Sequence, residues 1–168
     1  MERSKKVVFV SHCLLNQNVR PSGSEKYPGA VKDLLQLFAE AGIGIVQLPC
    51  PHIEFKEGFD RKLKPKTTYE TNGYRICCQK ISSSIIEQIE KYLREDYSVV
   101  AIVGVELSST CGVHQVEKGR RNVPGKGILI EEIEKNMEKK NFQVPLIGVN
   151  LNNIYSSIER VQSLLNFS

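Results

Sequence analysis

The sequence predicts an α/β protein, a single-domain, Rossmann-like or flavodoxin-like three-layer sandwich with a mainly parallel sheet of about four strands. Short apolar runs alternate with longer segments of helical periodicity, which is the order that a parallel sheet requires. The strand-like runs carry almost no charge, as expected for strands that are covered on both faces. The 168 residues are enough for one hydrophobic core, so we expect residues 1–168 to form one domain.

The first part of the chain is expected to supply two strands and one crossover helix. Residues 7–10 are apolar and mostly β-branched, which predicts the first strand. A helix is predicted over residues 28–41, because Pro28 suits a first helical turn and Gly42 is a typical stop. Its apolar positions recur at helical spacing: Val31, Leu34, Leu35 and Phe38. Residues 43–48 are predicted to be the second strand.

The next part begins with a long connection. Residues 51–73 are polar and rich in Pro and Gly, and a connection of this length inside a domain is typical of a functional loop. Residues 74–95 show helical periodicity, and residues 98–105 are predicted to be the third strand. Cys77 and Cys78 open this helix and are expected to pack under the sheet.

The last part completes the alternation. Residues 111–127 form a glycine-rich basic loop, interpreted as a lid, an anion-attracting rim or a plain solvated loop. A helix over residues 128–141 and a fourth strand over residues 145–149 follow. Asn152 or Asn153 is expected to cap a final helix.

Composition excludes several function classes. The net charge of +4 is modest, and Lys and Arg are interspersed with Glu, so no nucleic-acid polymer is expected as a partner. No apolar run approaches the ~20 residues of a membrane span, so no membrane is expected either. The chain starts without the pattern of a signal peptide, which predicts a cytoplasmic protein with reduced thiols. A homodimer stays open.

Three of the five cysteines follow predicted strands: Cys13, Cys50 and Cys111. Each has a histidine within three residues: His12, His52 and His114. If the strands are parallel neighbours, their carboxyl ends share one rim, where open α/β sheets place their sites. Three thiolates on one rim indicate a soft metal or a cluster. Cys13, Cys50 and Cys111 lie too far apart in sequence for a local zinc knuckle.

Several centres remain open from the residues alone. Three thiolates match a [4Fe-4S] cubane with one iron left free of protein. They also match a zinc site of the Cys₃His type that uses His52 or His114, in a hydrolase or another zinc-binding protein. Cys13 or Cys111 could act as a metal-free nucleophile, and each cysteine could instead be a small buried hydrophobe. A non-enzymatic metal or sulfide carrier is a further alternative.

At these residues the chain resembles the 2-thiouracil desulfidase family and its relatives. The first motif, Ser-x-Cys-Leu-Leu, reads Ser11-His12-Cys13-Leu14-Leu15, with Arg20 and Gly23 after it. The second, Cys-Pro-Glu, reads Cys50-Pro51-His52, and the third, Ser-Pro-Ser-Cys-Gly, reads Ser108-Ser109-Thr110-Cys111-Gly112. The chain departs from the family at His52, at Ser109 and Thr110, and at Asn16, where the family has Gly.

The resemblance implies an iron–sulfur-dependent desulfidase. Cys13, Cys50 and Cys111 would hold an oxygen-sensitive [4Fe-4S] cluster, and the sulfur of a small thiolated molecule would bind the open iron. Water would convert the C=S group to C=O and release hydrogen sulfide. The expected substrate is a thio-heterocycle such as a thiolated nucleobase.

Residues expected at the same edge of the sheet are candidates for acid/base catalysis and for substrate binding. Glu106, His52 and Glu54 are the candidates for general acid and base, although Glu106 could equally be a solvated strand terminus and Glu54 could face water. The substrate-binding candidates carry amide, guanidinium, hydroxyl or imidazole groups: Asn16, Arg20, Ser108, Ser109 and His114. Arg20 could instead be a surface ion-pair residue, and His12 a half-buried structural histidine.

Overall fold

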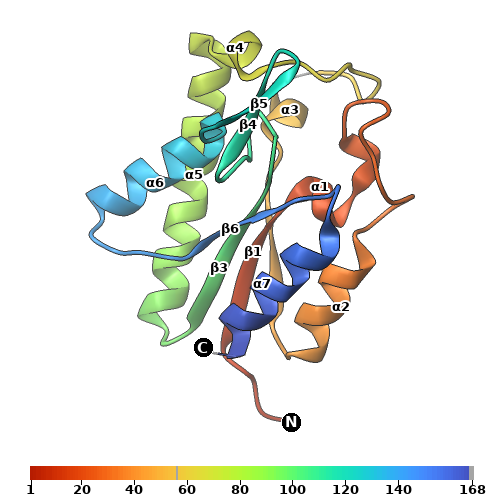
Figure 1. Cartoon of the computed structure of the whole chain (residues 1–168). Coiled ribbons are helices and arrows are strands. Elements are labelled where there is room, and N and C mark those ends of the chain that lie inside the picture. The colour runs from red at the N-terminus through yellow and green to blue at the C-terminus, as the bar shows by residue number, and fades with distance from the viewer. Residues whose placement is uncertain (56, 167–168) are drawn as a thin grey trace.

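The middle layer of the fold is a parallel four-stranded sheet (Figure 1). The computed structural model describes residues 1–55 and 57–166. The strands follow the order β2-β1-β3-β6 and have these bounds: β1 Lys6–Ser11, β2 Gly44–Leu48, β3 Ser98–Val105 and β6 Leu146–Val149. Every pairing between them is parallel, so their carboxyl ends lie at one edge. The predicted α/β fold with about four parallel strands is confirmed.

Helices cover both faces of this sheet. Helix α2 (Lys32–Glu40) lies beside α7 (Ile154–Asn166) on one face. Helix α5 (Asn72–Arg94) lies beside α6 (Ile128–Lys139) on the other face. This arrangement gives the three layers of the predicted sandwich.

Short elements follow the carboxyl ends of the strands. Two come after β1, namely α1 (His12–Leu15) and the 3₁₀ helix η1 (Gln17–Val19). The long connection after β2 contains α3 (Pro51–Glu54) and α4 (Lys66–Tyr69). After β3 the chain forms an antiparallel hairpin of β4 (Gln115–Lys118) and β5 (Arg121–Pro124). These elements build the walls of the candidate site.

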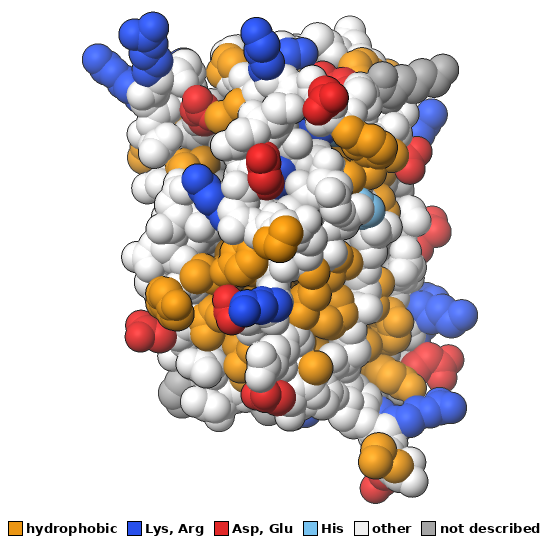
Figure 2. Space-filling view, turned by 90° about the vertical axis from the view of Figure 1, so that its right-hand side faces the viewer, with side chains coloured by type: hydrophobic (Ala, Val, Ile, Leu, Met, Phe, Trp, Pro, Cys, Tyr) orange, Lys and Arg blue, Asp and Glu red, His pale blue; other side chains and the backbone are white. Residues whose placement is uncertain are grey.

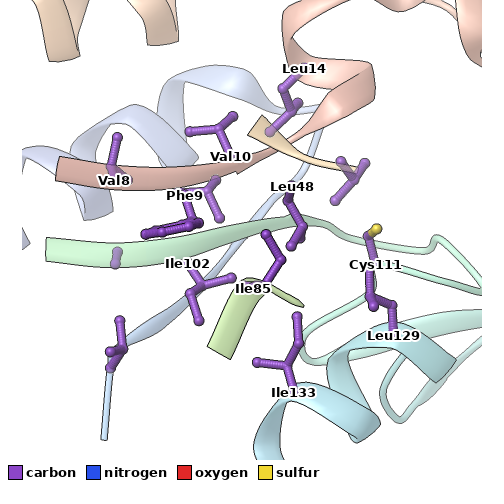
Figure 3. Packing of buried hydrophobic residues seen from close by; sticks show 14 of the residues in the cluster. Val8, Phe9, Val10, Leu14, Leu48, Ile85, Ile102, Cys111, Leu129 and Ile133 are labelled. Carbon is purple, nitrogen blue, oxygen red and sulfur yellow. The ribbon is translucent and has the colours of Figure 1, made fainter. Parts of the chain in front are cut away.

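The core lies on both sides of β1. Val8 and Val10 point to one face of this strand and Phe9 to the other, toward Ile102 (Figure 3). All are fully buried, which explains why the strand carries no charge between its ends. Leu48 packs at the carboxyl end of the sheet, on the side of Figure 3 where Cys111 lies.

Strand β2 is an edge of the sheet. Among the described strands it pairs with β1 alone, and its Ile45 is one of the exposed large hydrophobic residues. Figure 2 looks at the molecule from the right-hand side of Figure 1 and shows hydrophobic side chains gathered in the lower half of that face, between charged ones.

Two sequence predictions about local structure are wrong. The first crossover helix begins at Lys32 and not at residue 28, because Gly29 and Val31 hydrogen-bond to the turns after β1. The carbonyl of Gly29 accepts from the N–H of Gln17 (2.6 Å), and the N–H of Val31 donates to the carbonyl of Leu14 (2.9 Å). The basic segment predicted as a loop contains the β4–β5 hairpin.

Candidate functional site

The structure brings the three predicted thiols to one cavity. Cys13 lies in α1 directly after β1, Cys50 directly precedes α3 after β2, and Cys111 lies in the turn after β3. All three line a cavity of about 290 Å³ at the carboxyl edge of the sheet. Parallel strands β2, β1 and β3 are consecutive neighbours in the sheet, which is why residues so far apart in sequence meet here.

The three thiols interact electrostatically. Burial raises the pKa of Cys111 well above its ordinary value, and the nearby Cys13 and Cys50 raise it further. Burial also raises the pKa of Cys50, with a further contribution from Cys13. Burial raises the pKa of Cys13, although the guanidinium of Arg20, with Nη1 4.0 Å from Sγ, opposes this. Each thiolate therefore disfavours the ionisation of its neighbours, an effect that a positive centre bound by all three would offset.

The spacing of the ligands does not suit a single ion. Among the described residues, no three Cys, His, Asp or Glu side chains stand close enough together to hold one metal ion. One zinc would need four donors at about 2.0–2.3 Å. A cubane binds each thiolate to a different iron and therefore accepts more widely separated sulfurs. The three thiols fit a cluster, and the geometry does not support the Cys₃His zinc alternative.

His52 lies in the cavity wall at the centre of a hydrogen-bond network. Its Nδ1 lies 2.6 Å from a carboxylate oxygen of Glu57. Its Nε2 lies 3.2 Å from the hydroxyl of Thr110 and 3.3 Å from that of Tyr74, and these two hydroxyls are 2.6 Å apart. With both ring nitrogens engaged and its side chain 11% exposed, His52 is not free to bind a metal.

The surroundings keep this imidazole neutral. Burial and the nearby Arg61 guanidinium lower the pKa of His52 to about 4, although Glu57 works in the opposite direction. Burial alone would raise the pKa of Glu57, but the hydrogen bond to His52 and the nearby charges, those of Lys64 and Arg61 among them, together outweigh burial and lower it. Neutral His52 therefore donates its Nδ1 proton to an ionised Glu57 and accepts a hydrogen bond at Nε2.

Glu106 lines the same cavity as the three cysteines, but its carboxylate is bonded to the backbone. Its side chain is 7% exposed, and its carboxylate accepts the backbone N–H groups of Val113, His114 and Gln115 at 3.0–3.1 Å. These bonds fix the chain that follows Cys111. These three bonds give the Glu106 carboxylate a structural role, and the acid/base role that the sequence suggests for it stays a prediction. Glu54 lies exposed on α3 and is not among the described residues that line the cavity.

The substrate-binding candidates divide into two groups. Arg20, Ser108 and Ser109 line the cavity. Asn16 is not among the described lining residues, and its side chain caps η1 by accepting from the N–H of Asn18 at 3.1 Å. The side chain of His114 is 62% exposed and lies outside the cavity, 3.6 Å from Glu106. Asn16 and His114 therefore do not lie where the sequence predicted.

The two serines are engaged with the backbone. Ser109 Oγ donates to the carbonyl of Lys64 at 2.9 Å, which ties the third cysteine turn to the long connection. Ser108 Oγ accepts the N–H groups of Thr110 (3.2 Å) and Cys111 (3.0 Å). These bonds shape the turn that presents Cys111.

Sequence reasoning missed three residues of the site and its hydrogen-bond network: Glu57, Arg61 and Tyr74. Arg61 lines the cavity with a side chain that is only 8% exposed. Its Nη1 donates to the carbonyl of Val19 at 2.7 Å, and its Nε lies at an ion-pair distance of 3.5 Å from Glu57. The only signal in the sequence was the length of the connection that holds Glu57 and Arg61.

The other two cysteines lie away from the three thiols of the cavity. Cys78 is fully buried on α5 and Cys77 is half-buried there, and neither is among the described residues that line the cavity.

Within the described part of the chain, no helix has the length and apolar character needed to cross a membrane.

Comparisons with known proteins place the chain. No family model matches it. Uncharacterized protein MJ0003 of Methanocaldococcus jannaschii is 34% identical over 145 residues, which cover 86% of this chain and 86% of that protein. The solved structure of the [4Fe-4S]-dependent thiouracil desulfidase TudS is similar with a TM-score of 0.56 and 15% identity, over 94% of this chain and 99% of that one. The expected resemblance is thus confirmed at the level of the fold. The chain belongs to the same family as the M. jannaschii protein and has the fold of the thiouracil desulfidase.

Proposed function

We propose that this protein is a [4Fe-4S]-dependent desulfidase that removes sulfur from a small thiocarbonyl compound. The expected substrate is a thio-heterocycle such as a thiolated nucleobase. The observation that carries this proposal is the convergence of Cys13, Cys50 and Cys111 on one cavity. The fold shared with a desulfidase named for such a cluster supports it.

In this proposal Cys13, Cys50 and Cys111 hold the cluster as thiolates. A cluster with three protein ligands supplies one open iron, a Lewis acid that binds the substrate sulfur. Arg20 and Arg61 balance the negative charge of the thiolates, since both act electrostatically on Cys13. The overall reaction converts C=S and water into C=O and hydrogen sulfide, with no external electrons.

His52 and Thr110 are the groups placed to move the proton. Thr110 lines the cavity, and its hydroxyl lies 3.2 Å from His52 Nε2. Thr110 orients a water molecule toward the substrate carbon and passes its proton to Nε2, while Glu57 at Nδ1 stabilises the charged ring. That proton then passes to the departing sulfide, and the second proton of the water follows as the C=O bond forms, so both protons end on hydrogen sulfide. Proton transfer through this pair is the role that the sequence had assigned in part to Glu106.

Anaerobic reconstitution tests the ligand set. Iron and acid-labile sulfide are counted in the wild type and in Cys13→Ala, Cys50→Ala and Cys111→Ala. Cys77→Ala is the matched control, because this cysteine lies outside the cavity lining. We expect about four irons and four sulfides per chain in the wild type and in the control, and loss of both in each of the other three variants. Unchanged iron in any one of them removes that residue from the ligands.

Turnover is tested with 2-thiouracil as the probe, by measuring hydrogen sulfide release from the reconstituted protein. Release that depends on the cluster supports the desulfidase. A loaded cluster without release from this or other thiocarbonyl compounds would favour the carrier function instead. One zinc per chain without acid-labile sulfide would restore the Cys₃His reading.

A further inference from the structure

Ser11 has a buried hydroxyl without an ordinary partner. It is the last residue of β1, and its side chain is next to the cavity-lining Cys13 turn with only 1% of the residue exposed. Among the described residues, its Oγ makes no hydrogen bond of ordinary geometry. Ser11 precedes α1 but provides no side-chain cap to it. A buried hydroxyl without a partner is costly, so this serine requires an explanation.

The sheet register directs this hydroxyl toward Cys111. Val10 pairs with Val103 in the parallel β1–β3 ladder, so the next residue, Ser11, lies opposite Gly104. Side chains opposite each other in a ladder point to the same face. The chain folds back over that face of Gly104, because the N–H of Val105 donates to the carbonyl of Cys111 at 2.9 Å. A Cβ atom on Gly104 would collide with this carbonyl.

The chemistry of the two groups is complementary. A thiolate accepts hydrogen bonds, whereas a neutral thiol is a weak acceptor, so the hydroxyl gains a full partner only when Cys111 is deprotonated. The hydroxyl of Ser11 lies close enough to the Cys111 sulfur to act on it. Metal ligation would make this sulfur a thiolate permanently.

We propose that Ser11 is a positioning residue whose hydroxyl donates a hydrogen bond to the Cys111 sulfur when that sulfur ligates the cluster. The inference rests on the proposed function. Hydrogen bonds to the sulfurs of a cluster stabilise its reduced, more negative state and so raise the reduction potential. Ser11 therefore both orients the Cys111 ligand and raises the potential of the cluster.

The test is an EPR-monitored redox titration of reconstituted Ser11→Ala beside the wild type, with iron counted in both. We expect Ser11→Ala to retain its iron and to show a midpoint potential shifted to more negative values. Ser82→Ala is the matched control, because Ser82 is equally buried but pairs with Asn136 on α5 and α6. This control is expected to leave the potential unchanged.

A second pair of variants makes the test independent of how well Ser11→Ala assembles. Ser11→Thr and Ser11→Val have the same shape and differ in the hydroxyl, so only the valine variant should show the negative shift. Equal potentials in the wild type and Ser11→Ala, or in the Thr and Val variants, overturn this inference and leave the desulfidase proposal standing. A wild type that binds no cluster overturns both.

Discussion

The hydroxyl of Tyr74 offers the sharpest test of how the cavity wall is held together. Tyr74 lies fully buried on α5, and its hydroxyl is 2.6 Å from Thr110 Oγ1 and 3.3 Å from His52 Nε2. Thr110 adjoins Cys111 and His52 follows Cys50 by two residues, so this one hydroxyl joins the two cysteine turns. The change Tyr74→Phe removes the hydroxyl and keeps the ring.

The loss of unfolding free energy in Tyr74→Phe depends on which hydrogen bonds Thr110 and His52 retain. Leaving a buried polar group without its partner costs about 1–3 kcal/mol. In the variant, Thr110 and His52 still lie 3.2 Å apart and can pair with each other, so neither is left alone. We therefore expect the lower part of that range, about 1–2 kcal/mol less free energy of unfolding. With a urea m-value of about 2 kcal/mol/M, the unfolding midpoint falls by about 0.5–1 M.

The assay is urea unfolding followed by far-UV circular dichroism under anaerobic, reducing conditions. Tyr92→Phe is the control, because Tyr92 is half-buried and its hydroxyl makes no hydrogen bond among the described residues. Its change should stay within about 0.5 kcal/mol. Combining Tyr74→Phe with Thr110→Val should cost about 1 kcal/mol less than the sum of the single changes. Strict additivity, or a Tyr74 variant as stable as the control, would refute the network.

Three further outcomes are expected. Glu106→Gln should lower the unfolding free energy by about 1–3 kcal/mol, because an amide side chain cannot accept hydrogen bonds from all three backbone N–H groups. A variant with full stability and no turnover would instead support an acid/base role for Glu106. Gly127→Ala should lose iron, because its Cβ would lie 2.5 Å from the backbone nitrogen of Cys111, whereas Gly29→Ala meets nothing within 4 Å and should retain iron. Burial opposes ionisation of Glu132, but the hydrogen bonds and positive charges of Arg75 and Lys135 together outweigh burial and lower the pKa of Glu132. Ionised Glu132 therefore stabilises the fold at pH values above the pKa of a carboxyl in the unfolded chain, and this stability is lost as pH falls through the lowered pKa. Glu132→Gln should therefore be less stable than the wild type at neutral pH and equal to it in acid, and a gap that persists unchanged in acid would contradict this assignment.

The strands could be predicted because their signal is local. Residues 98–105 are uncharged and mostly β-branched, and β3 has these bounds. The start of α2 could not be predicted in the same way. Gly29 and Val31 form backbone hydrogen bonds with Gln17 and Leu14, which precede them by more than ten residues, and helix propensity does not account for such contacts. The β4–β5 hairpin did carry a signal. Its two-residue loop begins with Gly119 at φ +66°, a glycine position that tight hairpins favour.

Some features of the site could be predicted from the sequence and others could not. The thiol positions follow from the topology, since each cysteine comes shortly after a strand of a parallel sheet. The partners of a carboxylate do not follow from topology. Glu106 and Glu57 look alike in sequence, but one faces three backbone N–H groups and the other faces an imidazole. Only the folded path of the loops distinguishes a structural carboxylate from one that can take part in proton transfer.

This distinction explains the departure at His52. The family that the chain resembles has a carboxylate directly after Cys-Pro, and here that position holds an imidazole whose far nitrogen binds Glu57. A carboxylate is thus still present, but it is bound to the far nitrogen of the imidazole and is not among the described residues that line the cavity, whereas the Thr110 hydroxyl lies 3.2 Å from the other nitrogen. In the proposed mechanism, a proton that leaves the cavity passes through neutral His52 before it meets the negative charge of Glu57. Loss of Glu57 would therefore leave the base in place and remove its charge stabilisation, whereas loss of His52 would disconnect Glu57 from the cavity altogether.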